Sequence, residues 1–204
     1  MAVRTLGVGI APVRFRVARQ KTKTVSIRPR WRGSLGKIVR VGQRVRLMLV
    51  KLYTQLKQSD LHCLSAFEAI QRYLGYAPLR QLRRFGLWEL ELDTAADVHR
   101  ILENSFYLVN PNKELHMLSQ LPKANLKEGE KRVLVKVDEA ESHTQTIKKI
   151  KQKTGVQLHS LHRYLIWELV GPASEDFVKN VIVSSSRTRG LLVNPVSQTF
   201  ECLT

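Results

Sequence analysis

Along residues 44–118, apolar positions recur first with a period of two and then with helical spacing. A period of two is typical of a half-buried strand, and a stripe every three or four residues is typical of an amphipathic helix. Capping residues and a glycine predict where the helices begin and end. The expected elements are a strand at 44–53, a helix from the Ser65–Glu68 capping box to Gly75, a strand at 79–92, a helix striped by Val98, Ile101 and Leu102 and capped by Asp93 or Thr94, and a strand at 115–118.

The same order returns after a polar stretch at 119–130, which contains Pro122 and Gly129 and reads as a linker. The second unit again predicts β-α-β-α-β. Its expected elements are a strand at 132–137, a helix striped by Ile147 and Ile150, a strand at 158–169, a helix striped by Phe177, Val178, Val181 and Ile182, and a strand at 200–203.

Three sequence anchors indicate that the two units are copies. Residues 79–90 return as 158–169, both reading Leu-x-x-Leu-basic-Arg-aromatic-x-aliphatic-Trp-Glu-Leu. Leu-Val-Asn-Pro occurs at 108–111 and 192–195, and the Leu-Val-Lys segment at 49–51 returns at 134–136. Anchors in the same order at nearly the same spacing predict an internal duplication.

The duplication predicts an α+β fold with helices on one face of each small sheet. The other face then needs a cover, which two copies in one chain can supply for each other. We expect an intramolecular pseudo-twofold pair, in which the long strands bearing Trp88 and Trp167 meet near the axis.

Charge divides the chain differently from the repeat. Residues 1–59 hold 15 Lys and Arg with no Asp or Glu, so they carry +15 of the net +17. The remaining 19 basic and 17 acidic residues leave +2 for the rest. The expected organisation is a basic N-terminal extension at 1–43, a first module at 44–118, a linker at 119–130 and a second module at 131–204.

A cationic segment without acidic residues gains affinity for polyanions through counterion release, and nucleic acid is the commonest polyanion. An import signal has the same composition and is the alternative reading. Within the arm, Trp31 either stacks on an unpaired base among arginines or anchors the arm on the body. The predicted RNA-binding residues are Arg14, Arg16, Arg19, Lys21, Lys23, Arg28, Arg30, Trp31, Arg32, Lys37, Arg40 and Arg44.

The remaining candidates for chemistry favour structural roles. Glu89 and Glu168 occupy equivalent positions, and we expect them to pair with Arg84 and Arg163 rather than to act as an acid–base pair. Both repeated tryptophans are expected in the core. The two cysteines and the His159-x-x-His162 pair do not form a metal-ligand pattern on a strand. The Lys148–Lys153 run is either a solvated helix face or a second phosphate contact. No catalytic residue, metal, cofactor or small-molecule substrate is therefore expected.

The first module resembles PurS, the small non-catalytic subunit of phosphoribosylformylglycinamidine synthase. The resemblance rests on the helix at 65–70, on Leu74-Gly75, on the Trp-Glu-Leu strand and on the Asn-Pro segments at 110–111 and 194–195. PurS works as a dimer, so the resemblance implies that two tandem copies form a covalent dimer. The Asp-Pro-Gln-Gly and Gly-Lys segments of that family are replaced here, and the family has no basic arm.

A second resemblance is to a small β-α-β-α-β protein of the large ribosomal subunit. It covers residues 82–109 of the first module and implies the same topology. With the basic arm, it leads us to expect a structural protein of a ribosome, and of a mitochondrial one, with rRNA and neighbouring ribosomal proteins as partners. A membrane span is not expected. The alternative is a PurS-like accessory subunit of an amidotransferase complex, in which the arm is dispensable.

Overall fold

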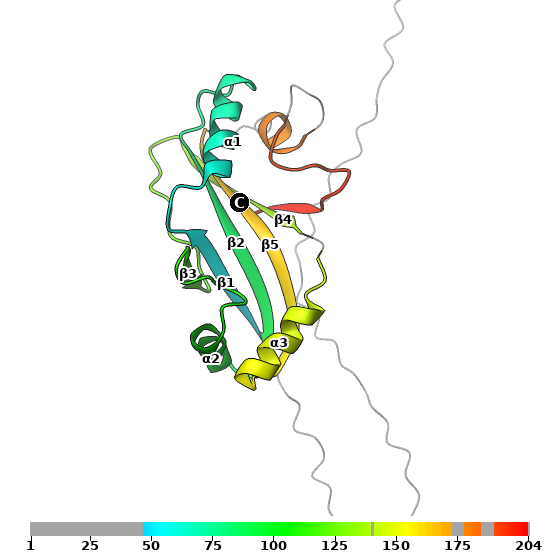
Figure 1. The fold of residues 1–204 in the computed structure, drawn as a ribbon. Coiled ribbons are helices and arrows are strands. Elements are labelled where there is room, and N and C mark those ends of the chain that lie inside the picture. The colour runs from blue at the N-terminus through cyan, green and yellow to red at the C-terminus, as the bar shows by residue number, and fades with distance from the viewer. Residues whose placement is uncertain (1–46, 140, 173–177, 185–189, 204) are drawn as a thin grey trace, which may run out of the picture. The chain divides into compact units, whose positions relative to one another are not determined.

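The computed structural model describes residues 47–139, 141–172, 178–184 and 190–203, all within one compact unit. The fold is α+β, with a six-stranded antiparallel sheet and few helices (Figure 1). The elements are β1 Met48–Leu56, α1 Leu61–Arg72, β2 Gln81–Leu92, α2 Ala96–Asn104, β3 Glu114–Leu118, β4 Lys131–Asp138, α3 Thr144–Thr154, β5 Leu158–Gly171, η1 Val178–Ile182 and β6 Phe200–Leu203.

The strand order in the sheet is β3-β1-β2-β5-β4-β6, and every neighbouring pair is antiparallel. The first three strands of the chain form one half of the sheet and the last three form the other. The two long strands join the halves, because β2 pairs with β5 along nearly its whole length, from Gln81–Val170 to Leu92–Leu158. The prediction that the two Trp-bearing strands meet is therefore confirmed.

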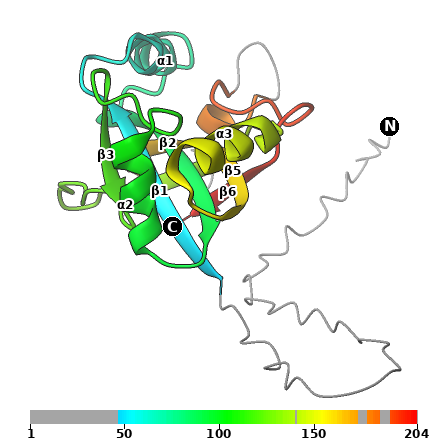
Figure 2. The ribbon, with the colours of Figure 1, turned by 60° about the horizontal axis from the view of Figure 1, so that its bottom comes forward.

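The four helical elements pack on one face of this sheet and bury two separate apolar clusters. The first cluster lies under α1 and η1 and includes Ile70 of α1, Trp167 of β5 and Ile182 of η1. The second lies under α2 and α3 and includes Trp88 of β2 and Ile150 of α3. Figure 1 shows α1 toward one end of the long strands and α2 and α3 toward the other, and Figure 2 shows α2 and α3 side by side.

The opposite face of the sheet has no helix among the described elements, and we call it the open face. At its centre Phe85, Leu87 and Ile166 are buried. The chain between β3 and β4 contributes to this cluster through Leu121. It is held there by Arg132, whose Nη2 donates to the Pro122 carbonyl at 2.9 Å. The expectation that the two units supply a cover for each other's sheet is wrong: their strands join edge to edge in one sheet.

The predicted start of the first helix is wrong by one turn. α1 begins at Leu61, and Asp60 is its N-cap, accepting from the amides of His62 and Cys63. Ser65 therefore lies inside the helix. The capping box failed as a signal because Leu61 and Leu64 are exposed and Cys63 alone is buried in the first turn, so the apolar stripe by itself does not reveal where the helix begins.

Three other predicted boundaries also change. β1 runs to Leu56 and not to 53, because its last five residues pair with β3. α2 has no side-chain cap: Asp97 instead accepts from the amide and hydroxyl of Thr94. The fourth predicted helix is a five-residue π-helix, and Phe177 lies outside the described residues. The remaining predicted strands and helices occur within two or three residues of their expected places.

Candidate functional site

The predicted RNA-binding residues lie outside the described part of the chain, which starts at Leu47. Their role stays a prediction. These positions are Arg14, Arg16, Arg19, Lys21, Lys23, Arg28, Arg30, Trp31, Arg32, Lys37, Arg40 and Arg44.

Within the described residues, a hollow lined by charged side chains lies near the middle of the β2–β5 pair, between the two apolar clusters. There Gly86 pairs with Leu165, the residue at the same place in the second copy of the repeated segment. The hollow has a volume of about 260 Å³, and Arg84, Arg163, Asp60 and Glu139 are among its lining residues. The hollow therefore lies at the Gly86–Leu165 pair, where the repeated segments 79–90 and 158–169 meet at equivalent residues.

Two matching sets of side chains stand on either side of this point. The Arg84 Nε donates to Asp60 Oδ2 at 2.7 Å, and its guanidinium lies 5.8 Å from the centroid of Trp167. On the other side, the Arg163 Nε lies 3.0 Å from Glu139, and its guanidinium lies 5.0 Å from the centroid of Trp88.

Each arginine thus spans from its own carboxylate to the tryptophan of the other long strand. Asp60 and Glu139 were not predicted as partners, although they are separated along the chain by the same distance as Arg84 and Arg163. Both guanidiniums are already ion-paired and stacked, which supports a structural role for the set.

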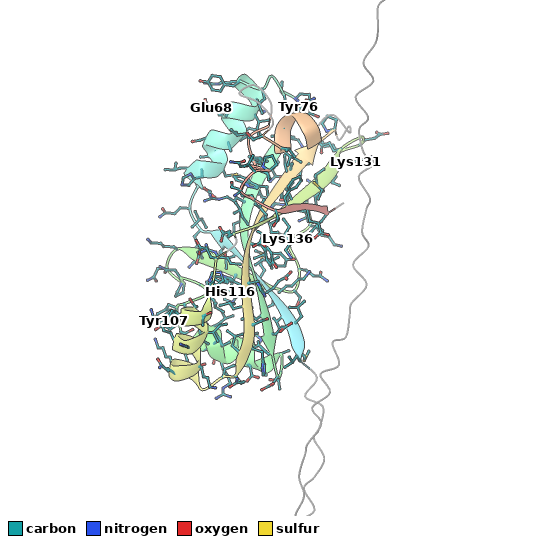
Figure 3. The ribbon with its side chains drawn as sticks, turned by 90° about the vertical axis from the view of Figure 1, so that its right-hand side faces the viewer. Glu68, Tyr76, Tyr107, His116, Lys131 and Lys136 are labelled. Carbon is teal, nitrogen blue, oxygen red and sulfur yellow. The ribbon has the colours of Figure 1, made fainter. Side chains whose placement is uncertain are left out.

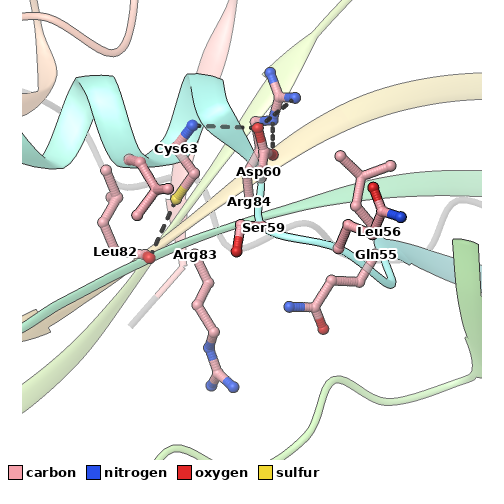
Figure 4. A pocket seen from close by; sticks show the side chains of 10 residues that line it. Gln55, Leu56, Ser59, Asp60, Cys63, Leu82, Arg83 and Arg84 are labelled. Atoms are coloured by element: carbon pink, nitrogen blue, oxygen red, sulfur yellow. Dashed lines mark hydrogen bonds and ion pairs between the residues drawn. The ribbon is translucent and has the colours of Figure 1, made fainter. Parts of the chain in front are cut away.

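A second hollow, of about 200 Å³, lies beside α1 and is lined by Cys63 and Asp60 (Figure 4). The Cys63 thiol donates to the Leu82 carbonyl at 3.2 Å. Burial, reinforced by the negative charge of Asp60, raises the pKa of the Cys63 thiol to about 11. Because the thiolate is the reactive form of cysteine, this residue is a poor nucleophile at neutral pH.

The two repeated glutamates lie on the open face and form two charge networks. Glu168 is fully buried between Arg83 and Arg132, and the Arg132 Nε donates to it at 2.5 Å. Glu89 accepts from the Lys136 ammonium at 2.8 Å and lies 3.9 Å from that of Lys51. Figure 3 labels Lys136, which also lies 3.6 Å from the ring centroid of Tyr164.

The expected pairing of these glutamates with Arg84 and Arg163 is therefore wrong. Successive strand residues point to opposite faces, so Arg84 and Glu89, five positions apart in one strand, cannot meet. The same holds for Arg163 and Glu168. The acid–base reading gains nothing from the observed pairs, because each carboxylate is neutralised by two basic side chains.

Trp88 and Trp167 are both in the core, as predicted, and each residue is 7% exposed. His159 and His162 lie on β5, and His159 Nε2 lies 2.9 Å from Asp93 Oδ1. Across the ranges that the structure describes, no three His, Cys, Asp or Glu residues gather as a metal site. Nor, within those ranges, is any helix long and apolar enough to cross a bilayer.

The four lysines of α3 are all exposed, as predicted for the outer face of that helix. Nearby, the Lys153 ammonium lies 5.4 Å from the ring centroid of Phe106, in the segment after α2. Phe106 is itself 65% exposed, and its sequence context did not single it out.

Comparison with known proteins found no matching family model, no matching curated protein and no matching solved structure.

Proposed function

We propose that this chain is a non-enzymatic, structural RNA-binding protein of a ribosome, and specifically of a mitochondrial one. Its basic arm contacts rRNA and its duplicated body docks on neighbouring ribosomal proteins. The observation that carries the proposal is the distribution of charge, with +15 in residues 1–59 and +2 in the rest. Extended cationic segments of this kind become ordered when RNA compensates their charge.

The charges of the body support this division. In the middle of the helix-bearing face, both arginines are occupied by carboxylates and tryptophan rings. On the open face, Glu89 and Glu168 are each held by two basic residues. Charged groups that neutralise each other hold a shape and attract a polyanion only weakly, which leaves the arm as the main source of RNA affinity.

The body is, in this proposal, two tandem PurS-like modules that form an intramolecular pseudo-dimer. The register supports it, because equivalent residues Gly86 and Leu165 face each other in the β2–β5 pair. The two apolar clusters support it as well, since they have corresponding members in Trp167 and Trp88, in Ile70 and Ile150, and in Leu192-Val193 and Leu108-Val109.

Each cluster takes nine of its thirteen buried members from one module and four from the other. α1 of the first module shares a cluster with β4, β5 and η1 of the second. α3 of the second module shares the other cluster with β1, β2 and α2 of the first. In such an arrangement neither module has a complete core of its own. The chain then corresponds to a dimer with shared cores, whose two subunits are linked by residues 119–130.

The test is co-sedimentation with ribosomal subunits isolated from mitochondria, comparing the full chain with a variant that lacks residues 1–43. We expect the full chain to sediment with one subunit and to crosslink to its rRNA through the arm. The arm-deleted chain should lose the crosslink and most of the sedimenting fraction. Equal sedimentation of both proteins without an RNA crosslink would contradict the proposal.

A second candidate is a non-catalytic PurS-like accessory subunit of an amidotransferase complex. The two halves of the sheet join edge to edge through β2 and β5, which favours this candidate. A covalent version of a PurS-like dimer would keep the surfaces by which such a dimer docks on its partner enzyme. It predicts a large protein partner and a dispensable arm. Affinity purification of the arm-deleted chain distinguishes the two: an intact amidotransferase complex recovered with it would favour this candidate.

A further inference from the structure

The outward face of α3 carries four lysines, at positions 148, 149, 151 and 153, and no acidic residue occurs between Thr144 and Thr154. The helix is fixed by Ile150, which is fully buried, so the lysines point away from the core. Lys149 and Lys153 are four residues apart, a spacing at which like charges repel by a few tenths of a kcal/mol. Lysines in the last turn also interact favourably with the helix dipole, so their number alone does not indicate a ligand.

The second observation is an exposed aromatic ring beside these lysines. Phe106 is 65% exposed, and its ring centroid lies 5.4 Å from the Lys153 ammonium. Tyr107 follows it and is 43% exposed. α2, from which this segment leaves, packs against α3, so the ring and the lysines share one surface of the body.

We propose that α3 and Phe106 form a second RNA-binding surface, which takes an unpaired RNA segment. The lysine ammonium groups bind consecutive phosphates, and the Phe106 ring stacks on a base. Amines that track a backbone next to an exposed aromatic ring are what single-stranded nucleic acid requires, because every base has a face for stacking. An acidic peptide would use the amines but would not need the exposed part of the ring. The inference rests on the proposed function and assigns the body its own contact with RNA.

The test uses the full chain and a fluorescein-labelled oligouridine as the probe, with affinity measured by anisotropy over a range of NaCl concentrations. One variant replaces the four α3 lysines with Gln. Its matched control replaces four exposed lysines elsewhere, at 113, 123, 127 and 131, so that the net charge falls equally. Phe106→Ala is compared with Tyr73→Ala, which removes an exposed ring from α1. Circular dichroism and the melting temperature verify that each variant is folded.

Each phosphate contact on a single strand contributes about 0.7 to the slope of log affinity against log salt, so loss of all four should flatten the slope by about 3. The control set should change it by less than about 1. Phe106→Ala should weaken binding at least about fivefold without changing the slope, since stacking releases no counterions. Tyr73→Ala should leave the affinity unchanged.

Equal slopes for the two lysine variants would overturn the inference, and so would binding of polyglutamate that is as sensitive to the α3 variant as RNA binding is. These failures differ from failure of the proposed function. If wild type binds RNA and only the arm deletion weakens binding, the function stands and the α3 surface is wrong. If wild type does not bind RNA, the proposed function itself fails.

Discussion

Replacing Glu168 with Gln should destabilise the body more than the same change at the equivalent Glu89. Glu168 is fully buried and is the shared partner of Arg83 and Arg132. A glutamine there keeps the shape and one hydrogen-bond acceptor but removes the charge that compensates two guanidiniums. At Glu89 the partners are lysines, and Lys51 is nearly half exposed and already 3.9 Å away.

The structure allows the two costs to be ranked. Removing one partner of a buried ion pair costs about 3–5 kcal/mol, because the remaining charge is left without compensation. Arg83 and Arg132 keep roughly a fifth of their side chains exposed, so the cost for Glu168→Gln should lie near the lower end, about 3 kcal/mol. Glu89 keeps 14% of its side chain exposed, and its half-exposed partner Lys51 can turn toward water, so about 1 kcal/mol is expected there.

Urea unfolding followed by tryptophan fluorescence measures the difference, since both repeated tryptophans are buried. With a slope of about 2 kcal/mol per molar urea, the midpoint should fall by about 1.5 M for Glu168→Gln and about 0.5 M for Glu89→Gln. Equal shifts for the two variants, or a shift below about 0.5 M for Glu168→Gln, would refute the reasoning that burial of the shared carboxylate determines the cost.

Three further predictions concern the centre of the sheet, the thiol and the modules. A Cβ at position 86 would lie 2.6 Å from the buried Thr54 Oγ1, so Gly86→Ala should lower the unfolding free energy by about 1–3 kcal/mol. Adding Thr54→Ala should restore part of that free energy in the same urea assay. With its pKa raised to about 11, Cys63 should react slowly with iodoacetamide at pH 8 and faster as the pH approaches 11; fast alkylation at pH 8, identified by peptide mass, would contradict this. Residues 44–118 and 131–204, expressed separately, should each be unfolded or self-associated by circular dichroism and sedimentation, and a folded monomer of either would argue against shared cores.

Much of this fold is readable from the repeated pattern. Trp88 and Trp167 lie in matching twelve-residue patterns, which predicted two copies, the long strands and the meeting of those strands. Period-two alternation also predicted β4 closely, because Val133, Val135 and Val137 face the helices.

The errors arose where a tertiary contact decides a local feature. Asp60 caps α1 and also binds Arg84, and the sequence around Asp60 gives no indication of this distant partner. The face crossed by the linker depends on Arg132 and Leu121, which contact residues far away in the chain. The partners of Glu89 and Glu168 were predicted wrongly because the nearest arginines in sequence were chosen. Each of those arginines is five residues away in the same strand and so points to the opposite face. The exposed Phe106 was missed, since one aromatic residue after a helix is usually read as core.

The most direct test of the division between a strongly cationic arm (+11 in residues 1–43) and a less charged body (+6 in residues 44–204) is the salt dependence of RNA binding with and without residues 1–43. If the ten predicted Lys and Arg contacts within residues 1–43 all form on single-stranded RNA, the full chain's slope of log affinity against log salt should exceed that of the arm-deleted chain by up to about 7. A residual slope of about 3, from the four α3 lysines, should remain. An arm-deleted chain that binds the same RNA with unchanged affinity and slope would contradict the account.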